Sequence, residues 1–216
     1  MTPSETNGTD LAFVDHLLFG AADLDRGIAA IEAALGVRPA IGGRHPAWGT
    51  RNALVSLGPR QYLEVFSPDP ESDYRGRRPF DVDRLETPRL VAMCVASSDL
   101  EGFAERGRSV GVDVGSISAG GRVREDGTVL SWRLTDPLLA GDGGARPFAI
   151  DWGDTPHPGG QAPPAGRLAG LRLEHPDPDR IRRELEAFGT PLVVEPAERA
   201  GLVARIESER GSVELR

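Results

Sequence analysis

The chain has no lysine, so all 25 basic residues among its 216 positions are arginines. Enzymes that hold a carbonyl substrate or pyridoxal phosphate as a Schiff base need a lysine amine, and P-loop proteins place a lysine on their nucleotide phosphates. The sequence therefore excludes both classes of enzyme.

Cysteine is almost as scarce. The single cysteine, Cys94, rules out an internal disulfide, so we expect the protein in the reducing cytoplasm. Cys94 lies in the apolar run "LVAMCVA", with no neighbour in sequence that would lower its pKa. We interpret it as a small core side chain rather than a nucleophile.

An excess of positive charge is also missing, as is any long apolar run. The net charge of -8 argues against binding to nucleic acid or to anionic membranes. No segment approaches the length of a transmembrane helix, and residues 1–10 have no signal-peptide pattern and are expected to be a disordered lead-in.

What the sequence does contain is a weak threefold repeat. Each copy starts with an apolar, strand-like run, at "FVDHLLFG", "RLVAMCVASS" and "GRLAGLRLEH". An Asp suited to a helix N-cap follows each run (Asp23, Asp99, Asp177), and then come apolar residues at helical spacing and about three short strands. We predict an α+β protein with two βαβββ units in residues 11–158 and a third βαβββ-like unit, residues 166–216, packed on them.

These stretches resemble the glyoxalase and bleomycin-resistance domains of the vicinal oxygen chelate superfamily. The motifs that carry the resemblance are "DHLLFGAADLDRGIAAIEAALGVRP", "GGRHPAWGTRNALVSLG", "YLEVFSP" and "PFAIDWGDTPHP". The resemblance implies that two units close a curved mixed sheet into a cup. It also implies a divalent metal at the floor of the cup, held by one residue from the first strand and one from the fourth strand of each unit. Two neighbouring substrate oxygens would bind this metal.

The implied ligands of the first unit are His16 and Glu64, which suit Mn, Fe, Ni or Zn. The second unit departs from the pattern, because Ala92 stands seven residues before Asp99, where the first unit has its histidine. Asp151 falls near the fourth-strand position, and His45 or His157 is a further source of a nitrogen ligand. In the third unit, Glu214 occupies the acid position.

His16 and Glu64 each have a second interpretation, because a buried histidine hydrogen-bonded to a carboxylate is also a common structural pair. Both residues alternate with apolar neighbours, and His16 falls on the face opposite Asp15, so we expect both faces of these strands to be covered. A buried Glu is uncommon unless it is paired or binds a metal.

A glycine-flanked turn, "GGRHPAWGT", holds His45, a candidate ligand or base. Around it we expect substrate contacts from Arg44, Trp48, Thr50 and Asn52. Arg133 is another candidate, since an arginine offers a two-pronged contact to a carboxylate. Ordinary strand-face or turn positions are the alternative for each of them.

Two functions remain open. One is a metal-dependent isomerase, lyase or dioxygenase, with Glu64, Asp151 and His45 as catalytic candidates. The other is a metal-free protein that sequesters an aromatic or cationic molecule in a cup lined by Trp48, Trp132 and Trp152. We expect the unpaired third unit either to cover a sheet edge or to mediate a homodimer, since an open sheet edge is a hazard.

Overall fold

The computed structural model describes residues 11–123 and 129–216 and shows an α+β fold with two sheets. Eight strands form a strongly curved sheet in the order β2-β3-β4-β1-β5-β8-β7-β6, and four form a second sheet in the order β10-β9-β11-β12. The predicted fold class is confirmed. The lead-in of residues 1–10 lies outside the described residues.

The first unit contributes half of the curved sheet. It consists of β1 (Val14–Gly20), α1 (Leu24–Leu35), β2 (Ala40–His45), β3 (Thr50–Gly58) and β4 (Gln61–Pro68). The Asp23 side chain accepts a hydrogen bond from the backbone N–H of Arg26 and so caps α1, as the sequence predicts. Gly36 ends the helix with a left-handed φ of 81°, a conformation that favours glycine.

The second unit follows a connector that includes the 3-10 helix η1 (Pro79–Arg84). It consists of β5 (Arg89–Ala96), α2 (Leu100–Ser109), β6 (Ser118–Val123), β7 (Val129–Leu134) and β8 (Phe148–Asp151). Asp99 caps α2 as expected. The segment between α2 and β6 is not a strand: Gly115 turns the chain there with a φ of 70°, and β6 begins only at Ser118.

The two units are related by an approximate twofold axis between β1 and β5. Asp23 and Asp99 are 76 residues apart. The same offset takes His16 to Ala92 and Leu18 to Cys94, so the antiparallel pairs Leu18–Ala92 and His16–Cys94 are equivalent to each other. Each strand carries one extra residue at the equivalent place, Asp15 in β1 and Val91 in β5, where the register shifts. The axis therefore identifies the counterpart of each site residue.

The third unit has the expected element order but a different topology. Its elements are β9 (Arg167–His175), α3 (Pro178–Phe188), β10 (Val193–Pro196), β11 (Gly201–Ser208) and β12 (Gly211–Leu215). In this unit the first strand lies between its second and third strands, so the unit forms a sheet of its own. Arg146, just before β8, makes a two-pronged ion pair with Glu184 of α3 at 2.9 and 3.0 Å, which ties the unit to the rest of the molecule.

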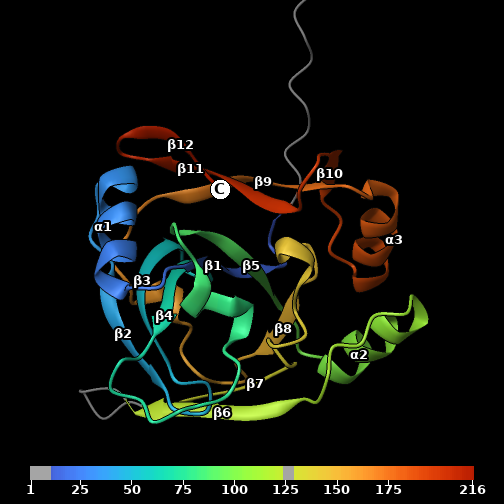
Figure 1. Ribbon diagram of the computed structural model, residues 1–216, viewed down its shortest axis with the longest axis horizontal. Helices are drawn as coiled ribbons and strands as arrows, with labels where there is room; N and C mark the ends of the chain where they lie inside the picture. The colour runs from blue at the N-terminus through green and yellow to red at the C-terminus, as the bar shows by residue number, and fades with distance from the viewer. Residues whose placement is uncertain (1–10, 124–128) are drawn as a thin grey trace, which may run out of the picture.

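The curved sheet separates two apolar clusters. The outer face packs against α1, α2 and the second sheet, and alternate strand residues such as Leu17 and Leu63 are fully buried there. Figure 1 shows the second sheet, in orange and red, along the top of the view with α3 beside it. The inner face holds a smaller cluster around Leu18, Cys94 and Phe148. Both faces of β1 and β4 are thus covered, and the inner face forms the floor of a pocket.

Candidate functional site

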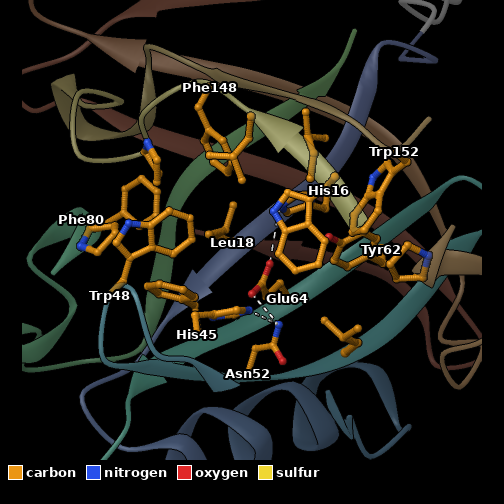
Figure 2. Close-up of a pocket in the computed structure, with 18 residues that line it drawn as sticks. His16, Leu18, His45, Trp48, Asn52, Tyr62, Glu64, Phe80, Phe148 and Trp152 are labelled. Carbon is orange, nitrogen blue, oxygen red and sulfur yellow. Dashed lines mark hydrogen bonds and ion pairs between the residues drawn. The ribbon is translucent and has the colours of Figure 1, made fainter. Parts of the chain in front are cut away.

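The concave face of the large sheet encloses a mostly apolar pocket that is rich in aromatic residues (Figure 2). All three tryptophans of the chain line it, with four other aromatic residues and two histidines, and none of the lining residues within the described ranges is an arginine. The lining consists of His16, Leu18, His45, Trp48, Asn52, Leu54, Tyr62, Glu64, Phe66, Pro79, Phe80, Trp132, Leu134, Pro137, Phe148, Ile150, Trp152 and Pro158. Such an apolar wall strengthens the electrostatic interactions of the few polar groups inside.

The structure brings His16 and Glu64 together at the floor of this pocket. Their strands pair in parallel, and Nε2 of His16 lies 3.5 Å from Oε2 of Glu64. Both residues are buried, with 3% and 6% of their surfaces exposed. Tyr62 stacks on the imidazole at a ring distance of 4.4 Å and fixes its plane. A nitrogen and a carboxylate oxygen thus face each other in an otherwise apolar hollow.

Asp15 lies behind His16 and is almost fully buried. Its Oδ1 is 2.7 Å from Nδ1 of His16, while its Oδ2 accepts from Nε1 of Trp152 and lies 3.1 Å from Nε2 of His157. Burial alone would raise the pKa of Asp15, but the hydrogen bonds from His157 and His16 outweigh it and lower the pKa to about 2. The sequence placed Asp15 on the opposite face of β1. It reaches His16 because it is the extra residue of the bulge.

A second chain of polar contacts starts at Glu64 and ends at His45. Asn52 donates from Nδ2 to Oε1 of Glu64 at 2.7 Å, and its Oδ1 accepts from the backbone N–H of Gly43, which fixes the orientation of the amide. The same Nδ2 lies 3.5 Å from Nε2 of His45, whose Nδ1 is 3.2 Å from Oγ1 of Thr50. His45 is the last residue of β2, rather than part of the turn that follows.

Several predicted residues are not brought to the pocket. Arg44 is half exposed and pairs with Glu71 and Asp69, and Arg133 pairs with Glu101 of α2 on the surface. Their guanidinium groups are occupied away from the pocket.

Asp151 and Glu214 also lie elsewhere. Asp151 follows the pocket residue Ile150 on β8 and accepts from the backbone N–H of Gly153. Glu214 pairs with Arg172 and Arg216 on the second sheet. Neither carboxylate is among the groups that line the pocket.

The second unit supplies no metal ligand at the positions equivalent to those of the first. The counterpart of His16 is Ala92. The counterpart of Glu64 is Phe148, because Glu64 pairs with Leu18 and Phe148 pairs with Cys94, the residue equivalent to Leu18. A divalent ion in this pocket would therefore be held from the first unit, by His16 Nε2 and a Glu64 oxygen, with His45, on the far side of Asn52, as the candidate third ligand. Imidazole and carboxylate together fit first-row divalent ions.

One other group lies close enough to share an ion. Ligand atoms of Asp15, His16 and Cys94 lie within 4.8 Å of one another. Burial, with the negative charges of Asp15 and Glu64, raises the pKa of Cys94 well above its usual value, so its sulfur stays a thiol, which is a poor ligand. Asp15 already receives hydrogen bonds on both oxygens. The pocket side of His16 suits an ion better than this group does.

Comparison with known proteins places this arrangement in a family. A model of the glyoxalase-like domain family matches residues 14–189, most of the chain. The chain belongs to the glyoxalase-like domain family. This match runs through both units of the cup and into α3 of the third unit. No curated protein matches the chain.

Two solved structures, the first two named here, share this fold at low sequence identity. A hypothetical protein from Staphylococcus aureus is 14% identical, with 87% of this chain and 86% of that one covered and a TM-score of 0.61. A 4-hydroxymandelate synthase mutant from Streptomyces coelicolor is 16% identical, with 93% and 60% covered and a TM-score of 0.54. A methylmalonyl-CoA epimerase from Mycobacterium tuberculosis is 18% identical, with 68% and 90% covered and a TM-score of 0.39. The vicinal oxygen chelate fold of the glyoxalase-like protein is confirmed.

A helix that could cross a membrane is absent from the described part of the chain. None of the helices there has both the length and the apolar character that crossing a bilayer requires.

Sequence reasoning missed one wall of the pocket. Phe80, in η1, packs against Phe66 and Phe148 at ring distances of 5.9 and 6.1 Å. Both Phe80 and the following Asp81 adopt left-handed backbone conformations, with φ of 60° and 47°, which cost about 1–3 kcal/mol each in residues other than glycine. No periodic pattern in residues 67–88 signals this contact.

Proposed function

We propose that this glyoxalase-like protein is a divalent-metal-dependent enzyme that acts on a small, largely apolar substrate with two neighbouring oxygens. The observation that carries the proposal is the approach of His16 Nε2 to Glu64 Oε2, 3.5 Å apart inside an aromatic pocket. An isolated structural pair would have no need of the polar residues Asn52 and His45, which converge on the same hollow.

Each group of pocket residues has its own role in this proposal. His16 and Glu64 would hold the ion, with His45 as a third candidate ligand, and a bound ion would supply a Lewis acid for a substrate oxygen on which charge develops. Asn52 keeps the Glu64 carboxylate in place by its 2.7 Å hydrogen bond. Trp48 and the other aromatic side chains bind the apolar part of the substrate and exclude water, which strengthens every electrostatic contact at the floor. An isomerase, lyase or dioxygenase reaction is compatible with these roles.

Metal titration tests the proposal without knowledge of the substrate. The purified protein, stripped of metal, is titrated with Mn²⁺, Co²⁺, Ni²⁺ and Zn²⁺ by calorimetry, beside elemental analysis of the protein as isolated. We expect one ion per chain, and a loss of at least about 100-fold in affinity in His16→Ala and Glu64→Gln, since even outer contacts to a ligand contribute about 10- to 100-fold.

The matched control is His175→Gln. His175 is a buried histidine that contacts Asp142 and lies outside the pocket, so its loss leaves the pocket donors in place. Absence of an ion, or equal affinity in His16→Ala, would remove the basis for a metal enzyme.

A second candidate function rests on the apolar second unit. With Ala92 and Phe148 in place of ligands and seven aromatic residues in the lining, the same pocket suits a metal-free binding protein for an aromatic molecule. A protein that is isolated without metal, binds none of the four ions, yet gives a calorimetric signal with a small aromatic probe such as indole would favour this candidate.

A further inference from the structure

The hydrogen bonds around Asp15, behind His16, have donors and acceptors that can be assigned one by one. Gly159 donates its backbone N–H to Nδ1 of His157 at 3.0 Å, so Nδ1 carries no proton and Nε2 carries the ring proton. That proton points at Oδ2 of Asp15, 3.1 Å away. Trp152 also donates to Oδ2, and an indole N–H has no other role than donor.

The other oxygen of Asp15 faces His16. An ionised carboxylate only accepts hydrogen bonds, so Nδ1 of His16, 2.7 Å from Oδ1, carries a proton. In the neutral ring the lone pair then lies on Nε2, the atom that faces Glu64 and the pocket. His157 and Trp152 donate to one oxygen of Asp15, and His16 donates to the other. Asp15 therefore accepts all three hydrogen bonds, which fixes the tautomer of His16.

We infer that Asp15 is a positioning residue, and that Trp152 and His157 of the second unit use it to keep the Nε2 lone pair of His16 directed into the pocket. Although this unit offers no ligand at Ala92 or Phe148, it takes part in the site through these two donors. The inference deepens the proposed function and rests on it for its consequence, metal affinity, but its core statement concerns the ring tautomer alone.

The variant Asp15→Asn should change Nδ1 of His16 from a hydrogen-bond donor to an acceptor. An amide has one acceptor and one donor end, and its NH₂ cannot face the N–H groups of both Trp152 and His157. The amide therefore turns its oxygen to those two donors and its NH₂ to Nδ1 of His16. The ring of His16 must then accept a hydrogen bond at Nδ1 and carry its proton on Nε2. That proton occupies the position of the lone pair that would bind an ion in the pocket.

Long-range ¹H–¹⁵N correlation spectra report the tautomer of each ring directly, and the chain has only four histidines to assign. At about pH 8, where an ordinary imidazole is neutral, we expect His16 as the Nδ1–H form and His157 as the Nε2–H form. In Asp15→Asn we expect His16 as the Nε2–H form and a loss of about 10- to 100-fold in Co²⁺ affinity. Asp113→Asn, at an exposed turn where Asp113 accepts from the backbone N–H of Gly115, is the control and leaves both readouts unchanged.

Two further variants keep the inference falsifiable if Asp15→Asn does not fold. His157→Leu removes one donor to Asp15 and is expected to lower Co²⁺ affinity several-fold, while His157→Gln keeps an N–H in reach and restores it. An Nε2–H form of His16 in the unaltered protein would overturn the inference, as would His157→Leu with unchanged affinity and tautomer. A correct tautomer in a protein that binds no metal would leave the inference standing and remove the proposed enzyme instead.

Discussion

The two halves of the cup share one backbone plan and differ in chemistry at equivalent positions. The first unit places Asp15, His16 and Glu64 where the second has Val91, Ala92 and Phe148. Even the bulge recurs, and its extra residue is the acidic Asp15 in the first unit and the apolar Val91 in the second. The comparison shows that the repeat provides geometry, namely caps, register and bulge, while the candidate metal ligands at equivalent strand positions occur in the first unit alone.

The bulge residues give the largest expected contrast. Asp15→Ala leaves the N–H groups of His16, Trp152 and His157 buried without their acceptor, and should lower the free energy of unfolding by about 3–5 kcal/mol. Val91→Ala removes only apolar contacts and should cost about 1–2 kcal/mol. Urea denaturation of both variants measures the difference. Equal losses would mean that the buried contacts of Asp15 contribute no more than packing.

The next effect comes from adding the missing ligands to the second unit. Ala92→His with Phe148→Glu places the counterparts of His16 and Glu64 on the opposite wall of the pocket. Calorimetric Co²⁺ titration should show affinity raised by about 100-fold, since even indirect contacts to a ligand contribute about 10- to 100-fold. Ile150→Glu, which puts a carboxylate on the same strand at a position that is not equivalent, is the control. A similar gain in that control would refute the symmetry argument.

Acid should weaken the fold through Asp15, the bulge residue of the first unit. The pKa of Asp15 is lowered in the folded state to about 2 from an ordinary value of 3.8. The stabilisation is therefore complete above pH 3.8 and is lost as the pH falls toward 2. Each pKa unit corresponds to about 1.4 kcal/mol, so the loss is about 2 kcal/mol. Unfolding free energies measured across this range should show the decline in the unaltered protein and a smaller one in Asp15→Asn.

The helix caps should behave alike in the two units. Asp23→Ala and Asp99→Ala each remove one side-chain hydrogen bond to a backbone N–H of the first turn, at the start of α1 and α2. Each should cost about 1 kcal/mol in thermal or urea unfolding. Asp25→Ala, within the first turn of α1 but not at its cap, should cost less. A large inequality between the two caps would show that the units differ in more than their polar groups.

Local sequence patterns predict much of this architecture. Asp23, Asp99 and Asp177 all cap helices, and the alternation of His16 and Glu64 with apolar neighbours predicts strands covered on both sides. Parallel pairing of β1 with β4 then brings the histidine and the glutamate together. These features depend on nearest neighbours in sequence, which is why they were predictable.

The rest depends on contacts that the sequence does not encode locally. A bulge reverses strict alternation, so Asp15 is predicted on the wrong face of β1. The loops of the second unit differ in length from those of the first, and the short strand β8 has no clear phase, so counting along the chain points to Asp151 where pairing places Phe148. The approach of Phe80 to the pocket depends on a left-handed backbone that only three-dimensional packing selects.

The concentration of all three indole rings around one hollow has a practical consequence. The tryptophan fluorescence of the chain comes from that hollow, because no tryptophan lies elsewhere in the sequence. A shift in emission wavelength thus reports on the interior of the cup, and an ion or small molecule that enters it can be followed without a label, separately from changes in the outer core.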